Sequence, residues 1–302
     1  MSTDLLVGRL EPPFTERAHE HPYAPGMKLF WPRGRTEARQ MTRSPLAHAT
    51  VLFKAGSYAE AEAEARAVAA ARSRPRDDPY APLALSMAAL AAGAQGHHDE
   101  ALATYDAVLP IFGRVFGAEH PQTLKLRSDR AQTLSAIARH AECEAECAAV
   151  ARAATRGREP EMPLIAAAAR NGQIYALNAQ ARHPEAEALA REALDAHRVP
   201  DRLGLVLRLG LARSLNGQVR HEEALAEAER ADELRRSLPE EERRTETGTV
   251  ELAVATALLG LHRGTEARVR AVTAHDACLA SFGPGHHRTL EARALLDRID
   301  GA

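Results

Sequence analysis

The chain has 302 residues, with 39 lysine and arginine residues against 41 aspartate and glutamate residues, so its net charge is close to zero. A near-neutral chain has no strong attraction for the phosphate backbone of nucleic acids or for an anionic membrane, and we expect neither as a direct partner. Hydrophobic residues make up 45% of the chain but aromatic residues only 4%, which is typical of closely packed helices with small side chains at their contacts and predicts an all-α protein.

Residues 1–43 form a non-repeating segment that holds five prolines and four aromatic residues. This much proline predicts an irregular chain, yet so many aromatic residues are not typical of disorder. We expect Phe30 and Trp31 to pack on the first repeat as an N-terminal cap. The alternative is a tethered peptide that occupies the binding groove of its own or another copy.

Residues 44–302 contain six copies of one pattern, in which a tyrosine or histidine stands three positions before a small residue; the sixth copy has Gly264 in place of the ring-bearing residue. The small residues are Ala61, Ala101, Cys143, Ala186, Ala224 and Ala267. They stand about 40 residues apart, and a fixed spacing of that size predicts a solenoid, because each unit buries its apolar face only against its neighbours. We therefore expect function to depend on a surface and not on a cleft.

Each copy joins two predicted helices. Apolar residues stand twelve and nine positions before each small residue, and small or apolar residues follow four and seven positions after it, so a helical stripe lies on either side. Between the two helices the chain is expected to turn at Gly56, Gly96, Ala138, Ala181, Val219 and His262. Six helix hairpins are predicted in this way. The charged run at residues 239–244 is expected to be a solvated helix end, and residues 291–300 a helix that caps the array.

The Gly-x-Tyr-x-Glu-Ala form of residues 56–61 and the regular spacing of small residues resemble tetratricopeptide repeats. The units exceed the usual length of about 34 residues and are similar to the kinesin-light-chain type. That type carries a Phe-Gly-x-x-His-Pro-x-Thr-Leu connector, which residues 116–124 match fully and residues 282–290 match except for His287. The resemblance implies a right-handed α-solenoid of about six hairpins, whose first helices line a concave groove that binds an extended or helical peptide.

The residues expected to face this groove in the third to fifth units are mostly polar. They are Lys125, Ser128, Gln132, Asn171, Tyr175, Asn178, Arg213 and Asn216. Amide side chains donate and accept hydrogen bonds at once, so they can hold a peptide backbone independently of its sequence, and tyrosine adds apolar area. We interpret the chain as a non-catalytic module that binds a peptide segment of a partner protein. The alternatives are a merely solvated wall and a sensor whose curvature changes on binding a peptide or metabolite.

Catalysis and cofactor binding have no motif in the sequence. Neither a glycine-rich phosphate loop nor a Gly-x-Ser-x-Gly or His-Glu-x-x-His motif occurs, so we expect no enzyme activity and no cofactor. The His-Glu-His cluster at residues 19–21 leaves a metal-dependent enzyme as a further alternative. Cys143 and Cys147 are a possible pair of ligands for a thiophilic metal, but their repeat positions predict that both pack against the neighbouring helix.

The sequence also indicates in which cellular compartment the protein is expected. No segment is long and apolar enough to cross a membrane, and the first residues lack the apolar run of a secretory signal. Three cysteines, an odd number, do not indicate a disulfide framework. We expect a cytoplasmic protein with a protein or peptide partner.

Overall fold

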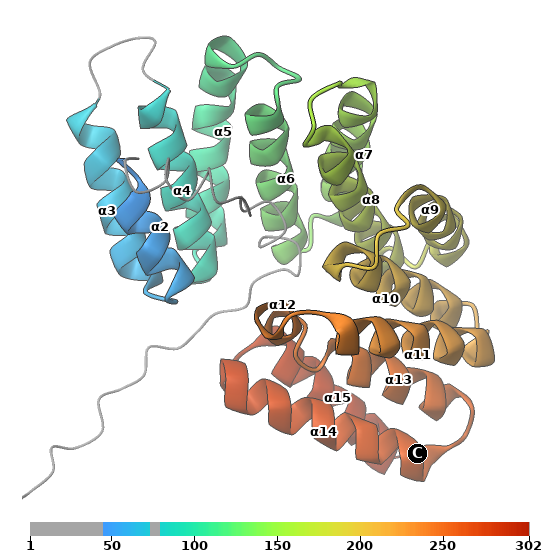
Figure 1. Cartoon of the computed structure of the whole chain (residues 1–302). Coiled ribbons are helices and arrows are strands. Elements are labelled where there is room, and N and C mark those ends of the chain that lie inside the picture. The colour runs from blue at the N-terminus through green and yellow to red at the C-terminus, as the bar shows by residue number, and fades with distance from the viewer. Residues whose placement is uncertain (1–44, 73–78, 302) are drawn as a thin grey trace, which may run out of the picture.

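The computed structural model describes residues 45–72 and 79–301, and these ranges form fourteen helices (Figure 1). They are α2 (Ala47–Lys54), α3 (Tyr58–Ala71), α4 (Tyr80–Ala94), α5 (His98–Val115), α6 (Pro121–Ala136), α7 (His140–Arg156), α8 (Met162–Ala179), α9 (His183–Ala196), α10 (Arg202–Gly217), α11 (His221–Ser237), α12 (Glu240–Thr245), α13 (Thr249–Gly260), α14 (Gly264–Phe282) and α15 (His287–Asp300). The described residues contain no strand, which confirms the all-α prediction. The predicted N-terminal cap at Phe30 and Trp31 lies outside the described residues.

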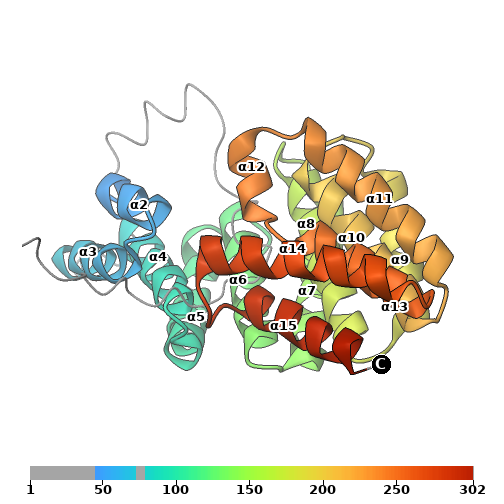
Figure 2. The ribbon, with the colours of Figure 1, turned by 90° about the horizontal axis from the view of Figure 1, so that it is seen from below.

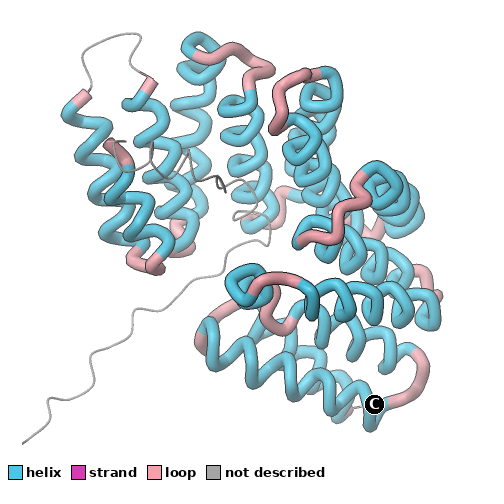
Figure 3. Tube along the Cα trace, in the orientation of Figure 1, coloured by secondary structure: helices cyan, strands magenta, loops and turns pink. Residues whose placement is uncertain are grey.

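The helices pair as α2 with α3, α4 with α5, α6 with α7, α8 with α9, α10 with α11 and α13 with α14, and each pair packs on the next. The six predicted hairpins are therefore confirmed, and α15 follows them where a capping helix was expected. Figures 1 and 2 show the hairpins stacked side by side along a curved array, and Figure 3 shows the short loops that join most of the helices.

The small residue that marks each unit lies buried where helices meet. Ala61, Ala101, Ala186, Ala224 and Ala267 have no exposed surface, and Cys143 is nearly as buried. A small side chain lets two helix backbones approach closely, so the apolar stripes on either side can pack against the neighbouring hairpin. The core is consequently a series of buried clusters along the array and has no single centre.

All six predicted turn positions adopt the left-handed backbone conformation. Gly56 and Gly96 do so without a side chain, whereas Ala138, Ala181, Val219 and His262 have φ between 57° and 61° despite carrying one. After each of these turns the next backbone N–H donates to a carbonyl five residues earlier, as from Arg220 to Leu215 at 3.0 Å. This bond satisfies a carbonyl that the end of the first helix leaves open.

Replacing Val219 by glycine is expected to stabilise the protein by about 0.5–1 kcal/mol. A β-branched residue in the left-handed region is strained by about 1–2 kcal/mol, and glycine relieves this strain. Glycine also has more conformational freedom in the unfolded chain, which offsets part of the gain. Val219 is 75% exposed, so little packing is lost. Urea unfolding monitored by circular dichroism measures the difference. The matched control is Val269→Gly inside α14, at a similarly exposed valine, where glycine should lower stability.

The two connector motifs begin the helices α6 and α15 by the same hydrogen bonds. His120 and His286 each accept, through Nδ1, the backbone N–H two residues later at 3.2 Å. The threonine of each motif donates to the carbonyl of the preceding glycine, at 2.7 Å in the first copy and 2.9 Å in the second. Burial, with Arg288 beside it, lowers the pKa of His286 to about 4, so the ring is neutral and its Nδ1 can accept.

The charged run at residues 239–244 is a separate short helix, α12, and not the end of α11. Helix α11 ends at Ser237 because Leu238 is extended and buried, and Pro239 has no N–H with which to continue the helix. A new helix, α12, begins at Glu240. Glu246, which is buried, lies between α12 and α13.

Candidate functional site

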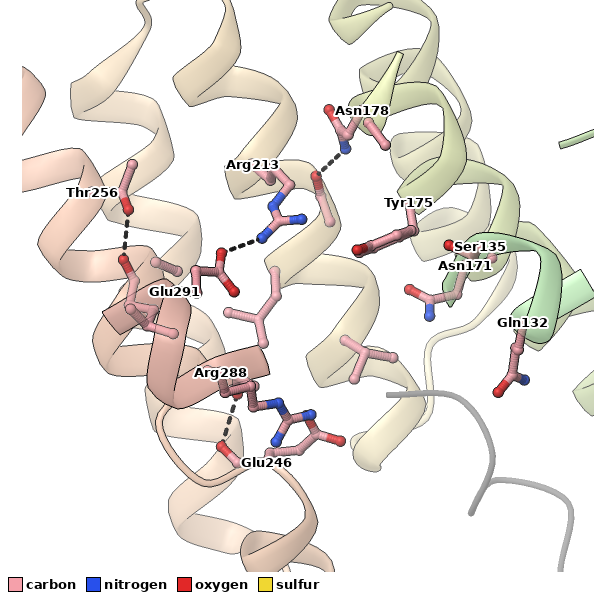
Figure 4. Close-up of a pocket in the computed structure, with 18 of the residues that line it drawn as sticks. Gln132, Ser135, Asn171, Tyr175, Asn178, Arg213, Glu246, Thr256, Arg288 and Glu291 are labelled. Atoms are coloured by element: carbon pink, nitrogen blue, oxygen red, sulfur yellow. Dashed lines mark hydrogen bonds and ion pairs between the residues drawn. The ribbon is translucent and has the colours of Figure 1, made fainter. Parts of the chain in front are cut away.

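The inner helices α6, α8, α10, α13 and α15 line a groove of about 740 Å³ (Figure 4). Its C-terminal part combines apolar side chains, among them Leu209, Leu252 and Leu295, with charged ones such as Glu291 and Arg298. Polar side chains from α6 and α8 form the other part. The size lies within the range of about 300–1,000 Å³ found for ligand sites.

Six of the eight residues expected in the groove line it: Gln132, Asn171, Tyr175, Asn178, Arg213 and Asn216. Lys125 and Ser128 do not. Ser128 is buried, and its hydroxyl donates to the Leu124 carbonyl at 3.0 Å within the same helix. Both residues lie one or two turns before Gln132 on α6, where the groove has not yet begun.

Asn178 lines the groove but uses its amide inside the protein. Its Nδ2 donates to the Gly210 carbonyl at 3.2 Å and to Ser214 Oγ at 3.0 Å, and its Oδ1 accepts from His183 Nδ1 at 3.0 Å. The pair of Asn216 Oδ1 and His221 Nδ1 repeats the last of these bonds one unit later. We therefore assign Asn178 to the packing of α8 on α10.

The histidines that stand three positions before the small residue of a repeat explain why two positions in the neighbouring helices are glycine. A Cβ atom on Gly217 would overlap the ring of His183, and one on Gly260 would overlap the ring of His221. Each ring thus occupies the space above a glycine in the first helix of the following unit. The histidines therefore join successive hairpins.

Tyr175 is held between two neighbours and still faces the groove. Its ring lies edge-on to the ring of His140, with centroids 6.4 Å apart, and the Arg213 guanidinium lies 5.5 Å from its centroid. Arg213 Nη2 in turn pairs with Glu291 Oε1 at 2.7 Å, which connects α10 to α15 (Figure 4). With 40% of its surface exposed, Tyr175 offers a positioned aromatic face.

Two amides beside Tyr175 have hydrogen-bonding capacity left over. Gln132 Oε1 is buried without a hydrogen-bond partner among the described residues. The side chain of Asn171 likewise makes no hydrogen bond or ion pair within that part of the chain. An unsatisfied buried acceptor costs about 1–3 kcal/mol, so a ligand that supplies a donor gains that amount. A peptide backbone supplies both a donor and an acceptor.

A buried charge cluster closes the C-terminal end of the groove. Glu246 Oε1 accepts from Arg202 Nε at 2.7 Å, and Arg288 Nη2 lies 3.5 Å from Glu246 Oε2. Arg288 Nη1 donates to the Thr245 carbonyl at 2.8 Å. Burial lowers the pKa of Arg288, and Glu246 opposes that shift. The repeat pattern does not predict this cluster, because its members come from α10, α15 and the segment between α12 and α13.

Helix α15 supplies a part of the groove that was not expected from the sequence, including Glu291 and Arg298. The signal was present: residues 282–290 repeat the connector that precedes α6, so α15 takes the place of the first helix of a seventh unit. A first helix lines the inner face. The capping helix is thus also a wall of the groove.

The structure provides no metal site within residues 45–72 and 79–301, since no three histidine, cysteine or acidic side chains there are grouped to hold an ion. The His-Glu-His cluster at residues 19–21 lies outside these ranges. Cys143 and Cys147 are buried with their sulfur atoms 4.0 Å apart, and they pack with Leu102, Leu134 and other apolar residues, as expected. No helix in the described part of the chain has the length and apolar character to span a membrane.

Comparisons with known proteins agree with this architecture. A family model described as tetratricopeptide repeat matches residues 80–145. The TPR-like repeats of a putative kinesin light chain from Podosopora anserina share 20% identity, with 64% of this chain and 93% of that chain covered and a TM-score of 0.54. The assembly chaperone of RpL4 (Acl4, residues 1–338) shares 17%, with 86% and 95% covered and a TM-score of 0.53. A comparison with curated proteins gave no match. The fold is a tetratricopeptide-repeat solenoid with kinesin-light-chain-like units, which confirms the resemblance seen in the sequence.

Proposed function

We propose that this tetratricopeptide-repeat solenoid is a non-catalytic interaction module, which holds a peptide segment of a partner protein in the groove between α6 and α15. The observation that carries the proposal is the set of hydrogen-bonding groups without a partner on Gln132 and Asn171, in the same groove as the exposed ring of Tyr175. A peptide backbone satisfies the amides, and an apolar side chain packs on the ring.

The two parts of the groove have separate tasks in this proposal. The amides on α6 and α8 hold the backbone, which gives affinity without much regard to sequence. The apolar part around Leu209, Leu252 and Leu295 accepts one side chain of the peptide, which gives selectivity. Arg213 and Glu291 neutralise each other between the two parts, so the proposal requires no charged group on the peptide.

Replacing Tyr175 or Asn171 by alanine is expected to weaken peptide binding tenfold or more, about 1.4 kcal/mol, through loss of the aromatic contact or of the amide hydrogen bonds. Peptides are first selected from a random displayed library with the full chain. Their affinities for the wild type and the two variants are then compared by fluorescence polarisation, with circular dichroism to check the fold.

Val269→Ala is the matched control, because Val269 is exposed on the outer helix α14, away from the groove. It should bind the selected peptides as the wild type does. Peptides that bind Tyr175→Ala and Asn171→Ala as tightly as the wild type would remove the assignment of the groove as the binding site.

A further inference from the structure

A second cavity, of about 410 Å³, lies between the outer helices α7 and α9 with α8 beneath them. Its lining consists of Ala148, Ala151, Arg152, Thr155, Arg156, Arg170, Gln173 and Leu189. Successive residues of a helix point about 100° apart, so Arg170 and Gln173 face the side of α8 opposite to Asn171 and Tyr175. The cavity is therefore separate from the groove.

Three arginines and no acidic residue line this cavity. Elsewhere in the array, arginines at the hairpin turns are matched by carboxylates; Arg220, for example, pairs with both Glu187 and Glu223. Three guanidinium groups at one cavity repel each other, and this repulsion falls when an anion enters between them.

The three arginines differ in how far carboxylates of the protein already neutralise them. Arg152 makes no ion pair or hydrogen bond with the described residues. Arg170 Nη2 is 3.6 Å from Glu192 Oε1, beyond hydrogen-bonding distance. Only Arg156 has a close partner, Glu119, and both of these side chains are more than half exposed, where an ion pair contributes little.

We propose that this cavity binds a phosphate group. The planar guanidinium fork matches the oxygen atoms of phosphate, and here arginines of α7 and α8 line one cavity. The amide of Gln173 and the hydroxyl of Thr155 supply further donors at the same cavity. Ala148, Ala151 and Leu189 complete the lining with apolar side chains, and the carboxylates of Glu119 and Glu192, which pair with Arg156 and Arg170, are not part of it. The phosphate belongs either to a free small molecule or to a phosphorylated side chain of a partner.

The test is calorimetric titration of the full chain with pyrophosphate at constant ionic strength. We expect saturable binding, which Arg152→Gln and Arg170→Gln each weaken tenfold or more because each removes charge-assisted hydrogen bonds. Arg270→Gln is the matched control, since Arg270 is an exposed arginine on the outer helix α14 that lines neither cavity. It should leave the affinity unchanged, as should Tyr175→Ala, so the result is independent of the peptide groove.

A parallel titration uses a short glycine–serine peptide with one phosphoserine. Tighter binding of the phosphopeptide than of pyrophosphate identifies a partner side chain as the source, and the reverse identifies a small molecule; both outcomes support the site. No saturable binding of either probe up to about 10 mM overturns the proposal. Equal weakening by Arg152→Gln and Arg270→Gln overturns it too, because binding is then a general effect of charge.

Discussion

Replacing Glu246 by alanine is expected to lower the free energy of unfolding by about 3–5 kcal/mol. Glu246 has no exposed surface, and it is the carboxylate between the buried guanidinium groups of Arg202 and Arg288. Without it, two like charges remain in a region where water cannot solvate them. Because the three residues join α10, the segment after α12, and α15, the loss should appear as early unfolding of the C-terminal hairpins.

Two variants separate the effect of burial from that of charge. Glu240→Ala removes an exposed carboxylate of the preceding helix α12, which pairs with Arg243, and it should cost less than about 1 kcal/mol. The triple variant Arg202→Met, Glu246→Leu, Arg288→Met removes the whole cluster, and it should recover much of the loss, since replacement of buried ionic groups by apolar ones is often neutral. Thermal and urea unfolding provide the comparison. A cost for Glu246→Ala no larger than that for Glu240→Ala would show that the cluster does not hold these helices together.

Gly248→Ala is the second substitution with a large expected effect, about 2–5 kcal/mol. Gly248 precedes α13 with φ of 78°, a conformation that costs an alanine about 1–2 kcal/mol. The added Cβ would also overlap Cys278 Sγ and lie 3.3 Å from the Ala274 carbonyl oxygen. Overpacking of this kind typically adds about 1–3 kcal/mol.

The overpacking part can be isolated by removing the sulfur. In the double variant Gly248→Ala, Cys278→Ala the contact with Sγ is absent, so the double variant should cost less than the sum of the two single variants. Gly113→Ala is the control, because Gly113 lies inside α5 with nothing within 4 Å of its would-be Cβ, and alanine there should stabilise the helix. Strict additivity between positions 248 and 278, measured by urea unfolding, would contradict the proposed contact.

The sequence predicts the hairpins well because their determinants are local. A small residue at a fixed place, apolar residues three and four apart, and one turn position per unit are sufficient to place each helix pair. Even the left-handed turns at Ala138 and Val219 follow from the repeat register, although neither residue type favours that conformation. Among the described helices, the six-residue α12 was not expected. Its charged side chains resemble the end of α11, so the sequence did not indicate that Pro239 separates two helices.

The site is less predictable because it depends on how units approach one another. A helical repeat tells which face Asn178 is on, but not that α10 comes near enough to bond its amide. The cluster of Arg202, Glu246 and Arg288 joins residues more than 40 positions apart, at places outside the repeat pattern. The role of α15 in the groove was predictable from the repeated connector, which indicated another first helix.

The groove and the arginine-lined cavity lie on opposite sides of α8, so one hairpin serves both proposed sites. Arg170 and Asn171 are neighbours in the sequence yet face different ligands in this account. A substitution at Arg170 should leave the groove intact, and a substitution at Asn171 should leave the arginine-lined cavity intact, because adjacent residues in a helix point in different directions.

Photocrosslinking of a selected peptide to the full chain, followed by mass spectrometry, tests the central claim most directly. A peptide with a photoreactive group at its apolar anchor should label groove residues of α8, α10, α13 or α15, such as Tyr175, Leu209 or Leu252, and excess unlabelled peptide should suppress the labelling. Labelling that falls instead on helices that do not line the groove, such as α3, α9 or α11, would contradict the claim that the inner wall of the array binds the partner.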